Sequence, residues 1–218
     1  IVIVGGDNVI PQRRLVDLTL VANERKYATT ADNALLTAAF QNRYYLSDDY
    51  YAATLPFGIA GREMYMPQYG LGRLIESPDE IVAMIDAYAQ QPTISPQNAL
   101  VTAYDFLIDE ANAINATLEQ QGITAANRTT LVDNQWTAQD YRDTAFGQAY
   151  GLISLNSHFD HYRFFPNDPN DVFATEIDNG TPYAGSLVFS VGCHSGLNVY
   201  AGGITPVPTG TDFAQAFT

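Results

Sequence analysis

A single cysteine and three histidines are the side chains of this 218-residue chain best suited to nucleophilic chemistry. Cys193 follows His158 by 35 residues (193 − 158). A thiol is only partly ionised at neutral pH, and a nearby imidazole makes it an efficient nucleophile and then protonates the departing amine. The pair therefore predicts acyl transfer, with Cys193 as the nucleophile and His158 as the general base.

The backbone around this pair suits the same reaction. The N–H groups of Cys193 and of Phe159, which follows the histidine, are placed to face a carbonyl oxygen that gains charge, and each such donor is typically worth ~10²–10³ in rate. Gly192 and Gly196 flank the cysteine, so a substrate backbone can approach and the chain can turn sharply. The sequence thus supplies a candidate oxyanion hole as well as a nucleophile.

A zinc site is the second interpretation of these residues, because imidazole, carboxylate and thiolate are all zinc ligands. The candidate ligands are His158, Asp160, His161, Cys193 and His194. Their spacing does not match ligand pairs held across a turn, so we expect no metal and rank a metal-dependent hydrolase third. His161 is also a rival general base, but it lies three residues beyond the position of His158, at which the preceding strand ends.

Oxygen ligands suited to calcium occur in two turns. One turn contains Asp48 and Asp49, and the other contains Asp168, Asn170 and Asp171. Neither has the full spacing of a known calcium loop, and solvated acidic turns are the simpler interpretation. We expect no required cofactor and keep calcium as an alternative structural ion.

Short apolar runs alternate with helical patterns, which predicts an α/β fold with a mainly parallel sheet. The runs that predict buried strands are residues 1–4, 99–103, 152–155 and 186–191. Helices are expected from Pro78, over 107–121 and over 138–149, and residues 15–67 are expected to be a long, partly ordered excursion. Two of the strands run into His158 and Cys193, so parallel neighbours would place both side chains at one edge of the sheet.

Composition excludes several classes of function. A formal charge of −14 disfavours contact with nucleic-acid phosphates and attracts basic peptides. One cysteine excludes an internal disulfide, and no apolar run approaches the ~20 residues of a membrane span. The abrupt beginning and end predict an incomplete fragment of a larger polypeptide, with a linker at residues 205–210.

Several segments, in order along nearly the whole chain, resemble the gingipain family of cysteine peptidases. They are IVIVGGDNVIP at 1–11, SDDYY at 47–51, YGLGRLIE at 69–76, LNSHFDH at 155–161 and FSVGCHSG at 189–196. That family belongs to the caspase-like group with clostripain, legumain and separase. The resemblance implies a caspase-like fold with helices on both faces of the sheet. It also implies a cysteine endopeptidase that acts through a thioester, with His158 as catalytic histidine and Cys193 as nucleophile.

One residue departs from the family pattern, which places glycine directly after the catalytic histidine. Phe159 stands there in this chain. Its backbone donor is retained, but the bulkier side chain narrows the space beside the histidine. A catalytically inactive surface or adhesion module is therefore the alternative function.

Substrate preference is expected to involve acidic residues after the strand at 99–103. Gingipain relatives often cleave after basic residues because an acid lies at the floor of the first substrate pocket, and Asp105 and Asp109 are the candidates for this position. The alternative is that they cap the following helix, since acidic side chains favour the amide-rich end.

The same resemblance implies the wider organisation of the protein. We expect one catalytic domain, with a first sub-domain at residues 1–95 and a second at 96–218 that carries the histidine and cysteine. Protein or peptide substrates are the expected partners, together with further domains of the same polypeptide. The protein is expected to be secreted or on the cell surface of a bacterium.

Overall fold

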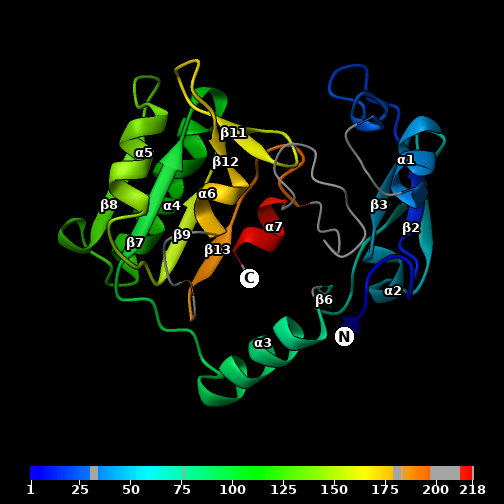
Figure 1. Cartoon of the computed structure of the whole chain (residues 1–218), viewed down its shortest axis with the longest axis horizontal. Helices are drawn as coiled ribbons and strands as arrows, with labels where there is room; N and C mark the ends of the chain where they lie inside the picture. Colours follow the sequence, from blue (N-terminus) through cyan, green and yellow to red (C-terminus); the bar gives the residue numbers. More distant parts are fainter. Residues whose placement is uncertain (30–33, 76, 179–182, 184, 197–211, 218) are drawn as a thin grey trace. The chain divides into compact units, whose positions relative to one another are not determined.

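The computed structural model describes residues 1–29, 34–75, 77–178, 183, 185–196 and 212–217 (Figure 1). The predicted linker at 205–210 lies outside these ranges. The described chain divides into two compact units, one up to Ile81 and one from Val82 onward. None of the described helices has the length and apolar character needed to cross a bilayer.

A four-stranded parallel sheet forms the centre of the second unit (Figure 1). Its strands, in spatial order, are β13 (Leu187–Phe189), β9 (Leu152–Leu155), β7 (Ala99–Ala103) and β8 (Arg128–Val132). The predictions of β7, β9 and β13 are confirmed. The edge strand β8 was not predicted, because its polar start at Arg128, Thr129 and Thr130 breaks the continuous apolar run typical of buried parallel strands.

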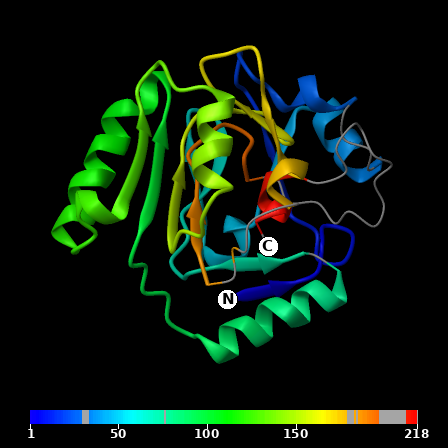
Figure 2. The ribbon, with the colours of Figure 1, turned by 60° about the vertical axis from the view of Figure 1, so that its left-hand side comes forward.

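Helices flank both faces of this sheet, and the alternation of side chains along β7 explains why. On one face, a cluster contains Ala99, Val101 and Ala103 of β7 together with Leu107, Ala111 and Leu118. The last two belong to α4 (Ile108–Gln120), and Leu107 directly precedes it. On the opposite face, Leu100 joins a cluster with Ile153, Leu155 and residues of α5 (Ala138–Ala145) and α7 (Phe213–Ala216). Figure 2 shows α4 and α5 separated by the strands. The α/β prediction is therefore confirmed at this level.

Smaller elements complete the second unit. They are η2 (Asp105–Leu107), η3 (Ala125–Asn127), α6 (Ala174–Asp178), and an antiparallel sheet of β10 (His158–Phe159), β11 (Arg163–Phe165) and β12 (Val172–Phe173). The helix expected to run to 149 ends at Ala145, because Gly147 and the turn before Tyr150 do not continue it.

The predicted start of α3 (Pro78–Gln90) is confirmed, and this helix runs from the first unit into the second. Glu80 accepts a hydrogen bond from the Ser77 N–H at 2.9 Å, and the Ser77 hydroxyl accepts one from the Glu80 N–H at 3.3 Å. This reciprocal pair is the capping box that the sequence predicted.

The first unit contains more regular structure than the sequence suggested. Its elements are β1 (Val2–Val4), β2 (Arg13–Val16), η1 (Glu24–Tyr27), α1 (Ala34–Gln41), β3 (Tyr44–Ser47), α2 (Asp49–Ala52), β4 (Pro56–Ile59), β5 (Arg62–Tyr65) and β6 (Gly72–Leu74). β1 pairs with β6 in parallel, and β2–β3 and β4–β5 form antiparallel pairs. The described part of residues 15–67 lies outside the four-stranded sheet, but it contains short strands and helices that the sequence did not reveal, because strands of four residues in such pairs leave little periodic signal.

Candidate active site

The carboxyl ends of three adjacent parallel strands carry the residues of the candidate site. Asp105 follows β7, His158 follows β9 and Cys193 follows β13. In the β13–β9 pair Leu187 lies opposite Leu152, an offset of 35 residues (187 − 152). The same offset separates Cys193 from His158, although both residues lie beyond the paired positions and the described contacts include none between their side chains.

The imidazole of His158 has a carboxylate partner. Its Nε2 atom lies 3.2 Å from Oδ2 of Asp105, and the two side chains are 44% and 57% exposed. An ionised carboxylate only accepts hydrogen bonds, so this contact favours the tautomer that carries its proton on Nε2. Nδ1 is then left as the basic nitrogen that can accept a proton from a thiol.

Asp105 itself is held in an unusual backbone conformation. Its φ of 58° lies in the left-handed region, where aspartate is one of the better tolerated side chains. The Asp105 N–H donates to Oδ1 of Asn134 at 2.8 Å, from the loop that follows β8. The Asp105 carboxylate contacts His158, and no described hydrogen bond joins this side chain to an N–H of α4. The expectation that Asp105 caps α4 therefore has no support among the described contacts.

Two aromatic rings flank the His158 imidazole. The ring centroid of Tyr104 lies 5.8 Å away in an edge-on arrangement, and that of Phe106 lies 5.5 Å away and is tilted. Tyr104 also contacts Trp136 edge-on, and Phe106 is 63% exposed. The imidazole is thus confined on one side by the core and on the other by a solvent-exposed ring.

Asn156 connects the three strand ends. It is fully buried, and its amide group donates to the Thr102 carbonyl at 3.2 Å and to the Ser154 hydroxyl at 2.7 Å. Its Oδ1 accepts a hydrogen bond from the Val191 N–H at 3.2 Å. Asn156 lies two residues before His158, and Val191 lies two residues before Cys193. This side chain therefore ties the cysteine loop to the histidine strand, a role that sequence analysis did not assign.

Cys193 is a free, exposed cysteine in a turn. The residue before it, Gly192, donates to the Ser190 hydroxyl at 3.0 Å, and its carbonyl accepts from the Ser195 N–H at 3.3 Å. Gly192 also packs against the ring of Phe159, so that a Cβ atom at Gly192 would lie only 2.7 Å from Cε2 of that ring. Only glycine fits there without displacing the ring.

Phe159 occupies the position at which the gingipain family has glycine, and its side chain packs in the hydrophobic core. The ring is 5% exposed and packs with Phe164 and Phe213 at centroid distances of 5.4 and 5.1 Å. The Asp160 N–H donates a hydrogen bond to the Arg163 carbonyl, so these two residues form a hydrogen-bonded pair. Hydrogen-bonded and non-hydrogen-bonded residue pairs alternate along antiparallel strands. The pair of Phe159 with Phe164 is then non-bonded, which directs the Phe159 N–H away from β11.

The remaining acidic candidates have local partners. Asp109 accepts a hydrogen bond from the Glu110 N–H at 2.9 Å in the first turn of α4, which suits the helix-capping alternative. Asp160 and Asp171 bind Arg163 at 2.8 and 2.6 Å, and the hydrogen bond to Asp160 is the main cause that raises the pKa of Arg163.

The two turns considered for calcium show similar local contacts. Asp168 accepts from the Asn170 N–H at 3.0 Å, and in the first unit Asp48 binds Arg73 at 2.5 Å. Arginine thus neutralises carboxylates in both turns, since Asp171 belongs to the same turn as Asp168.

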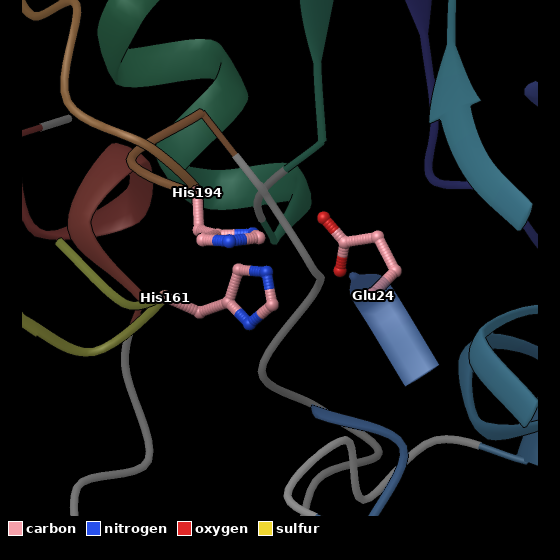
Figure 3. A group of neighbouring side chains, drawn as sticks. All are labelled: Glu24, His161 and His194. Carbon is pink, nitrogen blue, oxygen red and sulfur yellow. The ribbon is translucent and has the colours of Figure 1, made fainter. Parts of the chain in front are cut away.

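His161 and His194 lie next to each other in the second unit. Their imidazole rings meet edge to face, with centroids 5.1 Å apart (Figure 3). His161 is 2% exposed, whereas the His158 side chain is 44% exposed. Of the two candidate bases, His158 is therefore the one that a substrate can reach.

Comparison of the chain with protein-family models, with curated proteins and with solved structures finds no significant match.

Proposed function

We propose that the chain is a cysteine endopeptidase of the caspase-like, gingipain-type group, with Cys193 as nucleophile and His158 as general base. The observation that carries the proposal is the shared register of 35 residues, which brings the ends of β9 and β13 to one level of a parallel sheet. The carboxyl edge of such a sheet is the usual place for a site in α/β proteins. The free and exposed state of Cys193 agrees with a nucleophile rather than with a buried structural thiol.

The proposed reaction begins when Nδ1 of His158 accepts the thiol proton and the Cys193 sulfur attacks the peptide carbonyl carbon. The carbonyl oxygen becomes an oxyanion and receives hydrogen bonds from the N–H groups of Cys193 and Phe159. The C–N bond then breaks, and the imidazolium gives its proton to the departing amine. A thioester remains. Water, deprotonated by the same imidazole, hydrolyses the thioester and regenerates the thiol.

Asp105 is proposed to be a positioning residue in this reaction. Its contact with Nε2 fixes the orientation and the tautomer of His158, and its negative charge stabilises the imidazolium that forms at each proton transfer. The left-handed backbone of Asp105 supports this role, because strained conformations of this kind persist where the surrounding structure holds them.

Preference for basic residues before the scissile bond remains a prediction from the resemblance to gingipains. Asp105 contacts the histidine and Asp109 serves α4, so both carboxylates have partners other than a substrate. The expected location at the cell surface or outside the cell, and the presence of further domains, likewise remain predictions.

Digestion of a peptide library derived from a proteome tests the proposal. The purified chain is expected to cleave internal peptide bonds, and Cys193→Ser and His158→Ala are each expected to lower the rate by at least about 10³-fold. A short-lived acyl-enzyme should be trapped on Cys193 by acid quenching and mass spectrometry. Absence of cleavage by the unmodified chain would favour the inactive surface module.

A further inference from the structure

The ring of Phe106 is the exposed apolar side chain nearest to the candidate base among the described aromatic contacts of His158. Its centroid lies 5.5 Å from that of the imidazole, and the side chain is 63% exposed. Phe106 follows Asp105, whose left-handed backbone directs the chain outward at the end of β7. Single exposed apolar side chains are common on protein surfaces, so the feature that sets Phe106 apart is its position beside the candidate base.

We propose that Phe106 forms the contact surface for the side chain that follows the scissile bond, and that the protein favours apolar residues at that position. The inference rests on the proposed peptidase function. It adds a substrate preference on the leaving-group side, which neither the sequence nor the mechanism above assigns.

Proton transfer fixes where the leaving group lies. The departing amine takes its proton from the imidazole, so its nitrogen must come within about 3 Å of Nδ1 of His158. The side chain of the residue that carries this nitrogen begins roughly 2.5 Å farther on, at its Cβ atom. That places the side chain within about 6 Å of the imidazole, and the described aromatic rings within that range are those of Tyr104 and Phe106.

The other neighbours of His158 leave Phe106 as the accessible surface. Tyr104 contacts Trp136, and its hydroxyl donates to Asn167 at 3.4 Å, so its ring faces the core. Asp105 is negatively charged and 57% exposed, so it disfavours acidic residues at the same place. Phe106 attracts an apolar side chain, because contact removes apolar surface of both groups from water.

The test compares pairs of peptides that differ only in the residue after the scissile bond, with a cleavable sequence taken from the library digest. Leucine at this position should be cleaved about tenfold faster than serine, since contact of a leucine with an aromatic ring removes roughly 50 Å² of apolar surface. Aspartate should be cleaved more slowly than serine. In Phe106→Ser the leucine-to-serine ratio should fall close to one, and in Phe106→Leu it should be largely retained.

Tyr88→Ser provides the matched control, because Tyr88 is an aromatic residue on α3 with 67% exposure. It should keep the wild-type ratio. Phe106→Lys adds a gain of function, with aspartate becoming favoured over serine. A ratio is insensitive to a uniform loss of activity, so damage to the fold does not imitate the expected result.

The outcomes separate this inference from the function on which it rests. An unmodified chain that cleaves peptides without preference after the scissile bond overturns the inference alone. The same holds if Phe106→Ser keeps the full preference or if Phe106→Lys does not alter it. An unmodified chain that cleaves nothing overturns the proposed peptidase function and the inference with it.

Discussion

Nε2 of His158 lies 3.2 Å from Oδ2 of Asp105, although the two residues are 53 positions apart in the sequence. The parallel pairing of β7 with β9 brings them together, because each follows the carboxyl end of its strand. The contact favours the tautomer with its proton on Nε2, which leaves Nδ1 as the basic nitrogen, and it gives the candidate dyad a third member.

Asp105→Asn should lower kcat/KM about 10- to 100-fold, because an amide stabilises the imidazolium less well and no longer selects one tautomer. Steady-state hydrolysis of a library-derived peptide measures the effect. Asp109→Asn is the matched control, since Asp109 lies four residues away and contacts only the first turn of α4. Equal activity losses in the two variants would contradict a specific role for Asp105.

Gly192→Ala should strongly reduce alkylation of Cys193, because its new Cβ atom overlaps the Phe159 ring. The cost in stability should be about 1–3 kcal/mol, as for other overpacked sites. Gly196→Ala is the control, since a Cβ atom there meets no atom of the described residues within 4 Å. In the double variant Gly192→Ala, Phe159→Ala, the effects should be less than additive and part of the reactivity should return. Additive effects would show that the two residues do not contact each other.

Asn156→Ala should lower the free energy of unfolding by about 2–3 kcal/mol, since it leaves the Val191 N–H and the Thr102 carbonyl without their partner. It should also lower the rate of alkylation at Cys193, because the cysteine loop loses its link to β9. Denaturant unfolding and alkylation kinetics measure the two effects. Asn170→Ala, in an exposed turn, should change stability by less than about 0.5 kcal/mol. An unchanged rate of Cys193 alkylation in Asn156→Ala would show that Asn156 does not position the cysteine loop.

The ion pair of Glu176 with Arg142 should make the second unit sensitive to acid. The hydrogen bond from Arg142, at 2.6 Å, is the main cause that lowers the pKa of Glu176 below its ordinary value. A depressed carboxyl pKa contributes stability that is present above the unfolded value and is lost as the pH falls through the folded value. Glu176→Gln and Arg142→Gln should each remove about 1 kcal/mol at pH 7 and less near pH 3. Losses that do not depend on pH would contradict the assignment.

The sequence was sufficient for the centre of the fold because β7 is buried along its whole length and β9 along nearly all of its length. Such strands are continuous apolar runs, and the reactive residues follow them directly. The spacing of His158 and Cys193 equals the register of β9 and β13. The sequence alone could not show this equality, because the pairing of Leu187 with Leu152 is seen only in the structure.

Tertiary contacts explain what the sequence did not reveal. The sequence suggested that Asp105 lines a substrate pocket or caps a helix. Its left-handed backbone and its contact with His158 could not be predicted, because both depend on pairing between strands that are distant in the sequence. Asn156 and Asn134 gave no signal beyond a polar residue after a strand. In the first unit the strand predicted at residues 1–4 is present as β1, but the other short strands and helices were missed because four residues carry too little periodicity.

Alkylation of Cys193 is the most direct test of the central claim that this cysteine and His158 act together. The rate of carbamidomethylation by iodoacetamide at pH 7 would be followed by mass spectrometry in the unmodified chain, in His158→Ala and in the control His194→Ala. The account predicts rapid modification of the unmodified chain and a loss of at least tenfold in His158→Ala, with a smaller effect in His194→Ala. Equal rates in the unmodified chain and in His158→Ala would contradict it.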